Sequence, residues 1–322
     1  MGLKPRVLGA ALALAVSAGA GGTPARAAMD EQVVDIGGLS ATYTRPQGAP
    51  RAPHAVIIAG SGPTDRDGNN QAGLRTDTYK LLAHALAERG IATVRYDKRG
   101  VGGSAALLRS ERDLTVDLFA ADAVKVATWT RERAHGAPLV LIGHSEGGVV
   151  ALLAAKRAGA KALVLLATPG RPYGVILREQ FSRPGVPRAM NLAAVQVIGS
   201  LEQGKEVPNI DPALALVFRP TAQPFLISIM KIDPAERLRA LHLPTMVVGG
   251  GLDVQIGKTD FDALTGIGAS DDAYWDPTMG HTLKEMSPNA QSLRRAYTDP
   301  TLPLSVGLAE RIGKFISDQA GS

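Results

Sequence analysis

The sequence predicts an α/β fold, with a mostly parallel central sheet that is covered by helices on both faces. Short runs of aliphatic residues alternate with longer segments that have the spacing of amphipathic helices. The chain has 322 residues, of which 45% are hydrophobic, and is long enough to bury one large core. Because only 4% of the residues are aromatic, the predicted core consists mainly of aliphatic side chains and alanine.

The first half of the chain predicts strands and helices in regular alternation. Residues 32–43 alternate around Gly37-Gly38, which predicts a β-hairpin. Gly90 marks the end of the first predicted helix. The later strands are predicted at residues 55–59, 91–95, 139–142 and 162–167, and the helices at residues 78–89, 114–134 and 147–158.

This alternation is interrupted once. Residues 170–235 are rich in proline but contain helical pieces such as Met190 to Leu201, which predicts a helical insertion. Strands at residues 245–249 and 273–275 and a helix at residues 304–316 follow it. The predicted core domain therefore consists of residues 28–169 and 236–322.

The first 27 residues have the pattern of a secretory signal peptide. Lys4 and Arg6 precede an uncharged run of apolar and small residues, and Ala25-Arg26-Ala27 fits the small-x-small cleavage pattern. The alternative, a membrane anchor, is disfavoured because the run is shorter than the roughly 20 residues that a span needs. We expect cleavage near Ala27, export to the periplasm or the medium, and no stable membrane anchor.

Composition excludes several partners and nucleophiles. Loss of residues 1–27 removes three basic residues and no acid, which lowers the formal net charge from +5 to +2 and argues against a nucleic-acid partner. The sequence contains no cysteine, which excludes disulfides, a thiol nucleophile and a cysteine-linked lipid anchor. No metal or organic cofactor is expected.

The pentapeptide Gly143-His144-Ser145-Glu146-Gly147 carries the clearest chemical signal. It lies between a predicted strand and a predicted helix, which is the context of a nucleophile elbow, a sharp turn that exposes a strained serine. The two flanking glycines keep side chains out of the crowded turn. Ser145 is therefore the predicted nucleophile.

A serine nucleophile needs a base, and the base needs an orienting acid. In elbow-type hydrolases the acid and then the histidine follow the serine in the chain. Only His242 and His281 follow Ser145 by more than a turn, and His242 precedes a predicted strand, which places it at the wrong edge of the sheet. His281 follows the strand at residues 273–275, at the edge where open α/β sheets bind ligands, and is the predicted base.

Asp253 is the predicted acid, because it follows the strand at residues 245–249 and a run of glycines that permits a sharp turn. Its predicted role is to hold the tautomer of His281 and to stabilise the imidazolium. Other aspartates compete for this role. They are Asp260, which is predicted to lie in a helix, Asp271 and Asp272, which resemble a solvated turn, and Asp276.

Two backbone N–H groups are needed to hold the oxyanion of a tetrahedral intermediate. The predicted donors are the amide of Glu146, directly after the nucleophile, and the amide of Ser61, in the glycine-rich loop after the first central strand. The loop has two alternative interpretations, a tight turn and a phosphate cradle, but the Gly-Lys-Ser/Thr of a P-loop is absent. The Glu146 side chain is predicted to diverge from Ser145 and to serve structure or substrate tuning.

Two further charged segments are predicted to be structural. Residues 65–70 resemble part of a calcium loop but lack its later bidentate glutamate, so a hydrogen-bonded loop is predicted instead. The charges of Asp97, Lys98 and Arg99, which follow a predicted strand, are predicted to pin their loop.

Together these residues resemble the α/β-hydrolase superfamily over nearly all of the predicted mature chain. The elbow at residues 143–148 and the segment 96–104 match it, and the loop at residues 60–69 looks like that of bacterial cap-bearing esterases, close to the serine aminopeptidase-like branch. Residues 233–255 are also similar to that subgroup. One departure is Ala59-Gly60, where many relatives carry His-Gly.

The resemblance implies an α/β-hydrolase fold in which residues 170–235 form a helical cap over Ser145. Such a cap would shape the substrate pocket and exclude water. Its apolar side chains are candidates either for the pocket lining or for packing within the cap. They include Leu177, Phe181, Leu192, Val195, Phe218, Phe225 and Met230.

Three hypotheses for the function follow. The first is an exported serine hydrolase that cleaves small to medium carboxylic esters through an acyl-enzyme. The second is an aminopeptidase or amidase of the same fold, which needs a group that recognises a free amine, such as Glu146 or an acid in the cap. The third is a binding protein that kept the fold without activity. Epoxide hydrolase and dehalogenase chemistry is disfavoured, because it would need an aspartate in place of Ser145.

Overall fold

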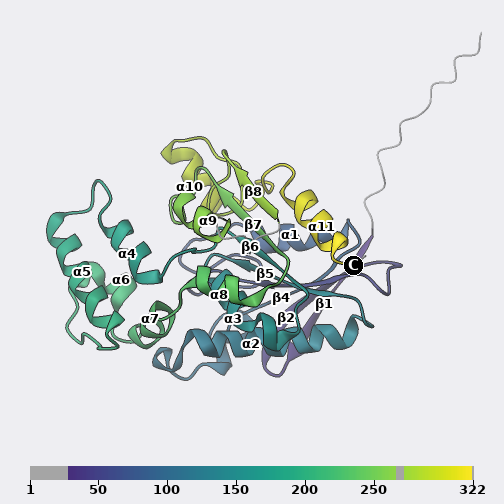
Figure 1. Cartoon of the computed structure of the whole chain (residues 1–322), viewed down its shortest axis with the longest axis horizontal. Helices are drawn as coiled ribbons and strands as arrows, with labels where there is room; N and C mark the ends of the chain where they lie inside the picture. The colour runs from purple at the N-terminus through teal and green to yellow at the C-terminus, as the bar shows by residue number, and fades with distance from the viewer. Residues whose placement is uncertain (1–27, 266–271, 321–322) are drawn as a thin grey trace, which may run out of the picture.

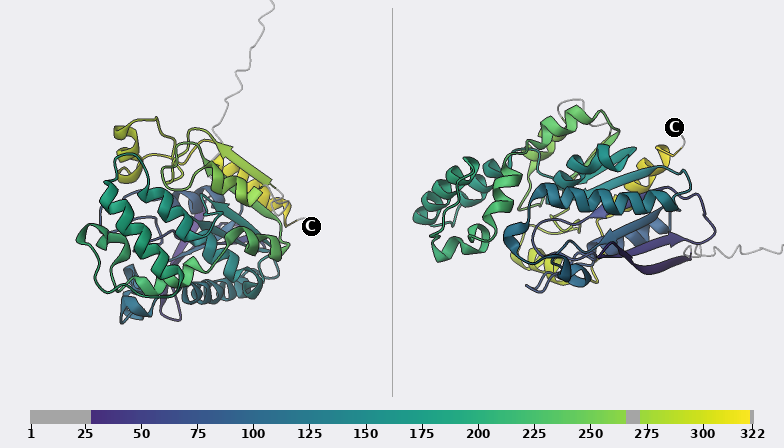
Figure 2. Two further views of the ribbon diagram at one scale, coloured as in Figure 1. Left: turned by 60° about the vertical axis from the view of Figure 1, so that its left-hand side comes forward. Right: turned by 90° about the horizontal axis from the view of Figure 1, so that it is seen from below.

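The computed structural model describes residues 28–265 and 272–320 (Figure 1). The predicted signal peptide and Asp271 lie outside these described residues. The described chain contains a large α/β unit and a group of helices that projects from one end of its sheet, as the right view of Figure 2 also shows.

An eight-stranded, mostly parallel sheet runs through the centre of the described residues, which confirms the predicted fold class. Its order is β1-β2-β4-β3-β5-β6-β7-β8. The hairpin β1–β2 pairs antiparallel with β4, and the remaining pairs are parallel. The strands are β1 (Met29–Ile36), β2 (Leu39–Pro46), β3 (His54–Ile58), β4 (Ala92–Tyr96), β5 (Leu139–His144), β6 (Ala162–Leu166), β7 (Thr245–Gly250) and β8 (Asp272–Asp276).

Alternate side chains of the strands point to opposite faces, and each face has its own apolar cluster. Val56 and Ile58 pack with α2, α3, α8 and α9 on one face, whereas Ala55 and Ile57 pack with α1 and α11 on the other. The helices that cover the sheet are α1 (Thr78–Ala87), α2 (Val116–Arg133), α3 (Glu146–Ala158), α8 (Pro234–Leu241), α9 (Lys258–Thr265) and α11 (Leu308–Asp318). The helix α10 (Ala290–Thr298) and two short 3₁₀ helices, η1 (Gly102–Leu107) and η2 (Glu111–Asp113), lie in the connections.

Between β6 and β7 the chain leaves the sheet and forms a helical segment with a core of its own. This segment contains α4 (Tyr173–Phe181), α5 (Arg188–Glu202), η3 (Pro212–Leu214), α6 (Ala215–Phe218) and α7 (Gln223–Met230). Its apolar cluster is separate from the two clusters of the sheet and includes Leu177, Phe218 and Met230. In the described residues no single helix is long and apolar enough to cross a membrane. Two consecutive helical stretches, η3–α6 and α7, are together long and apolar enough to do so, but the chain bends by 58° between them.

The structure differs from the predicted elements in a few places. Asp272, predicted to lie in a solvated turn, is the first residue of β8, where it pairs with Met246 of β7. The helices α8, α9 and α10 were not among the predicted elements, apart from the helical position of Asp260 in α9. Of these, α8 carries a clear start signal, because the Asp233 side chain accepts a hydrogen bond from the Glu236 amide and a proline follows it.

Candidate active site

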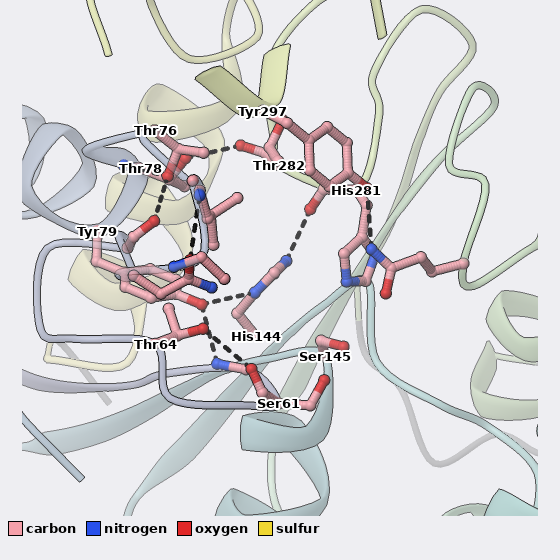
Figure 3. A pocket seen from close by; sticks show the side chains of 17 residues that line it. Ser61, Thr64, Thr76, Thr78, Tyr79, His144, Ser145, His281, Thr282 and Tyr297 are labelled. Carbon is pink, nitrogen blue, oxygen red and sulfur yellow. Dashed lines mark hydrogen bonds between the residues drawn. The ribbon is translucent and has the colours of Figure 1, made fainter. Parts of the chain in front are cut away.

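The predicted site residues all lie beyond the carboxyl ends of parallel strands. Ser61 follows β3, Ser145 follows β5, Asp253 follows β7 and His281 follows β8. Because parallel strands end at the same edge of a sheet, this topology gathers segments that are far apart in the chain. Figure 3 shows Ser61, Ser145 and His281 around one pocket.

Ser145 occupies the sharp turn that the sequence predicts between β5 and α3. Its backbone angles are φ 54° and ψ −125°, which cost a non-glycine residue about 1–3 kcal/mol. The Ser145 amide donates to the Leu166 carbonyl at 2.8 Å, and the Gly148 amide donates to the Ser145 carbonyl at 2.9 Å. These bonds to β6 and within the first turn of α3 hold the strained conformation in place.

The glycines around Ser145 are required by close backbone approach. A Cβ on Gly143 would overlap the carbonyl oxygen of Gly147. A Cβ on Gly147 would overlap the carbonyl oxygen of Ile58 in β3 and lie 2.6 Å from that of Ala59. The helix α3 can therefore start this close to the sheet only with glycine at these positions.

We expect Gly147→Ala to destabilise the protein by about 3 kcal/mol or more, because a backbone oxygen of a central strand cannot move aside cheaply. Urea unfolding followed by circular dichroism measures the change. Gly199→Ala in α5 is the matched control, since its added Cβ meets nothing within 4 Å. The control is expected to keep or slightly raise stability, and equal losses in both variants would contradict this account of the elbow.

His281 and Asp253 form a buried hydrogen-bonded pair. His281 Nδ1 lies 2.7 Å from Asp253 Oδ2, and the Asp253 side chain is 0% exposed. Burial alone would raise the pKa of Asp253, but the charge and hydrogen bond of His281 and the amides of Ile256 and Gln255 hold this pKa below its usual value. Asp253 is therefore a carboxylate that accepts the Nδ1 proton, and in the neutral ring Nε2 of His281 is then the nitrogen that can accept a proton.

The other predicted candidates for base and acid lie elsewhere. His242 ends α8 and precedes β7, at the opposite edge of the sheet. Asp260 lies in α9, as predicted, and pairs with Arg171. Asp276 accepts hydrogen bonds from Ser305 and Thr278 at the end of β8. The structure thus brings Asp253 to His281 and gives Asp260 and Asp276 partners of their own.

A buried chain of hydrogen bonds links the elbow to the neighbouring loops, and the sequence analysis gave no role to two of its members, Tyr79 and His144. His144 Nε2 lies 2.8 Å from the His281 carbonyl, and His144 Nδ1 lies 2.8 Å from the Tyr79 hydroxyl. Burial, together with the nearby His281, lowers the pKa of His144 to about 3, so this ring is neutral. Because a carbonyl only accepts, Nε2 carries the proton and the Tyr79 hydroxyl donates to Nδ1.

The two predicted oxyanion donors lie close to Ser145, the predicted nucleophile. Glu146 is the first residue of α3, and Ser61 lies in the loop after β3, where a Cβ on Gly60 would be 3.2 Å from Ser145 Cβ. Within the part of the chain that the structure describes, the amides of Ser61 and Glu146 donate to no protein acceptor. Both amides are therefore available to bind a ligand oxygen.

The Glu146 side chain diverges from Ser145, as predicted, and meets Lys98. Lys98 Nζ lies 3.6 Å from Glu146 Oε1, and both side chains are about 5% exposed or less. Burial raises the pKa of Glu146 and lowers that of Lys98, and their mutual attraction opposes both shifts. The pair carries no net charge whether or not the proton moves between them.

Two pockets meet at Ser61. The first, which we name the nucleophile pocket after the predicted role of Ser145, has a volume of about 430 Å³ (Figure 3). It is lined by Ser145, by His281 and by many hydroxyl and amide groups, including those of Thr64, Tyr79 and Tyr297. The apolar pocket, of about 460 Å³, lies between the α/β unit and the helical segment. Its apolar wall includes Leu108, Leu114, Phe119, Val217, Phe225 and Leu226.

The apolar residues of the helical segment that were candidates for the pocket lining lie in three different environments. Phe225 lines the apolar pocket. Leu177, Phe218 and Met230 instead pack within the segment's own cluster, and Phe181 packs against that cluster. Leu192 and Val195 are exposed. The helical spacing of apolar residues could not separate these three environments, because it does not show what packs against each face of a helix.

The two segments that were predicted to be structural are held by dense hydrogen bonds. Asp65 Oδ1 accepts three backbone amides, from Asp67, Gly68 and Asn69, at 2.9–3.0 Å. Arg99 forms a bidentate ion pair with Asp122, with Nη2–Oδ1 at 2.6 Å and Nε–Oδ2 at 2.7 Å. No group of three or more His, Asp or Glu side chains in the described residues is arranged to hold a metal ion.

The chain is similar to known hydrolases. Residues 73–212 match the family model of the serine aminopeptidases, S33. The esterase EstD of Thermotoga maritima is 27% identical over 237 residues, which are 72% of this chain and 54% of that protein. The matched region thus spans about half the length of this relative.

Solved structures share the fold at low sequence identity. Est1E from Butyrivibrio proteoclasticus, with ferulic acid bound, has a TM-score of 0.58 and 17% identity, over 90% of this chain and 100% of that chain. The proline iminopeptidase of Mycobacterium smegmatis has a TM-score of 0.53 and 15% identity, over 90% and 99%. Together with the strand order, these likenesses show that the chain has the α/β-hydrolase fold, and its sequence is similar to the serine aminopeptidases and to an esterase.

Proposed function

We propose that the protein is an exported serine hydrolase that cleaves carboxylic esters through an acyl-enzyme. The observation that carries the proposal is the strained Ser145 at a sheet edge, facing the same pocket as His281, whose Nδ1 is bonded to buried Asp253. Export is proposed from the signal-peptide pattern of residues 1–27.

The arrangement supports a two-step reaction. Ser145 Oγ attacks the ester carbonyl while His281 Nε2 takes its proton, and the amides of Ser61 and Glu146 bind the oxyanion. His281 then gives the proton to the leaving alcohol, and water releases the acyl group by the same route in reverse. Asp253 remains a carboxylate throughout and stabilises the imidazolium.

Hydrolysis of esters is favoured over removal of N-terminal amino acids. Recognition of a free amine needs an unpaired acid near the nucleophile. The described lining of the nucleophile pocket contains no Asp or Glu. In the apolar pocket, Glu146 is paired with Lys98, and Glu111 is paired with Arg219.

The two pockets suggest where the acyl group and the alcohol of a bound ester lie. The leaving alcohol must lie beside His281 to receive its proton, which assigns it to the hydroxyl-rich nucleophile pocket. The acyl group is then assigned to the apolar pocket, part of whose wall comes from α6 and α7. The helical segment at residues 170–235 would act as a cap that limits acyl length.

Initial rates on p-nitrophenyl esters from acetate to decanoate, compared with aminoacyl-anilides, test the proposal. We expect ester hydrolysis to exceed anilide hydrolysis at least 100-fold, with a maximum at an intermediate acyl length. Faster cleavage of the anilides would contradict the proposed esterase function and support an aminopeptidase instead. Absence of both activities, together with no labelling by a fluorophosphonate probe, would favour a binding protein.

A further inference from the structure

Lys98 and Glu146 are buried charges to which the proposed reaction gives no direct role. Burial of two charges is costly unless each finds good partners. Lys98 Nζ is 3.6 Å from Glu146, which is longer than a hydrogen bond, and its short bond goes elsewhere, to the Gly60 carbonyl at 2.5 Å. The shortest polar contact of this lysine is therefore with the loop that carries Ser61.

Gly60 is held at both of its backbone polar groups. Its amide donates to the Tyr79 hydroxyl at 2.9 Å, and its carbonyl accepts from Lys98. The peptide that joins Gly60 to Ser61 is trans, so its C=O and N–H point in opposite directions from one rigid plane. Fixing the Gly60 carbonyl toward Lys98 therefore fixes the direction of the Ser61 amide.

The second donor is connected to the same lysine. Glu146 supplies its backbone amide to the oxyanion site and its side chain to Lys98. The Lys98 ammonium also lies over the Phe119 ring, with Nζ 5.3 Å from the ring centre, which limits the positions that the ammonium can take. One side chain thus contacts the peptide of one donor and the side chain of the residue that carries the other.

We propose that Lys98, held by Glu146, is a positioning residue that orients the Gly60–Ser61 peptide in the oxyanion hole. This inference rests on the proposed function. A donor that is already oriented costs no reorganisation when the oxyanion forms, and a hydrogen bond to the carbonyl polarises the same peptide and strengthens its N–H as a donor.

The double variant Lys98→Met/Glu146→Gln removes both charges of the pair, and so distinguishes loss of the positioning role from the effect of one unpaired buried charge. Lys98→Met alone leaves Glu146 unpaired, so a fall in Tm is expected with it. We expect kcat on a p-nitrophenyl ester to fall about 10- to 100-fold in the single and the double variant, with KM changed by less than about twofold. In the double variant Tm should recover while kcat stays low. Recovery of kcat together with Tm would overturn the positioning role.

Asp122→Asn is the matched control. It weakens a buried ion pair with Arg99, the next residue along the same loop, and Asp122 does not contact Gly60. We expect Tm to fall and kcat to stay unchanged. An equal fall of kcat in Asp122→Asn and in the double variant would attribute the effect to loop packing. Absence of ester turnover by the wild type would overturn the proposed function, whereas an active wild type with unchanged kcat in the double variant would overturn only the role of Lys98.

Discussion

Ser145→Ala is expected to lower kcat/KM for ester hydrolysis by about 10³-fold or more while leaving the fold intact. The change removes only Oγ. The contacts that hold the turn are the backbone bonds to Leu166 and Gly148, and they do not involve the side chain. Steady-state rates on the best p-nitrophenyl ester measure the loss, and Tm checks the fold.

Covalent labelling gives the same prediction a second readout. A fluorophosphonate probe should modify the wild type on the peptide that contains Ser145 and should fail to modify Ser145→Ala. Ser200→Ala, at a partly exposed serine of α5, is the control and should be labelled and active like the wild type. A Ser145→Ala variant that keeps a tenth of the activity would exclude Ser145 as the nucleophile.

Asp253→Asn is expected to lower kcat by about 10³- to 10⁴-fold. Asp253 Oδ1 accepts the amides of Gln255 at 2.7 Å and Ile256 at 2.9 Å, whereas Oδ2 faces His281. In the variant these two amides keep the carbonyl oxygen of asparagine on their side, so its NH₂ group faces His281 Nδ1. The ring must then place its proton on Nε2, and it can no longer accept the proton of Ser145.

The competing aspartate provides the comparison. Asp276→Asn makes the same chemical change, from a carboxylate to an amide, at a residue that accepts hydrogen bonds from Ser305 and Thr278 and does not contact His281. We expect this variant to lose stability and to keep kcat within a few-fold of the wild type. If Asp276→Asn removed activity and Asp253→Asn did not, the assignment of the acid would be wrong.

The strands and the main helices were predictable because their apolar patterns are strong. The strands β3, β5 and β6 are fully buried and mainly aliphatic. The first helix ends at Ala87, two residues before the predicted end, and Gly90 lies in the turn that follows. The missed helices α8 and α10 are short and mostly polar. In α10 only Ala296 is buried, and α8 buries only Pro234 and Leu238, so few apolar residues mark them in the sequence.

The arrangement of Ser145, Asp253 and His281 was predictable because chain order and strand ends constrain it. Their catalytic roles remain predictions until the variants are measured. The links through Tyr79, His144 and Lys98 were not predictable in the same way. Tyr79 and His144 are 65 positions apart in the chain, and Lys98 is 38 positions from Gly60. Such contacts depend on how loops pack at the sheet edge, and no local pattern encodes them.

The strained backbone of Ser145 also means that thermal stability and activity make opposite demands at this position. Positive φ is easy for glycine and costly for serine, so glycine at this position would relax the turn at the expense of the nucleophile. Selection for thermal resistance alone would therefore favour loss of the hydroxyl. A programme of laboratory evolution on this protein should screen turnover in every round, because heat tolerance gained at the elbow is a sign of inactivation.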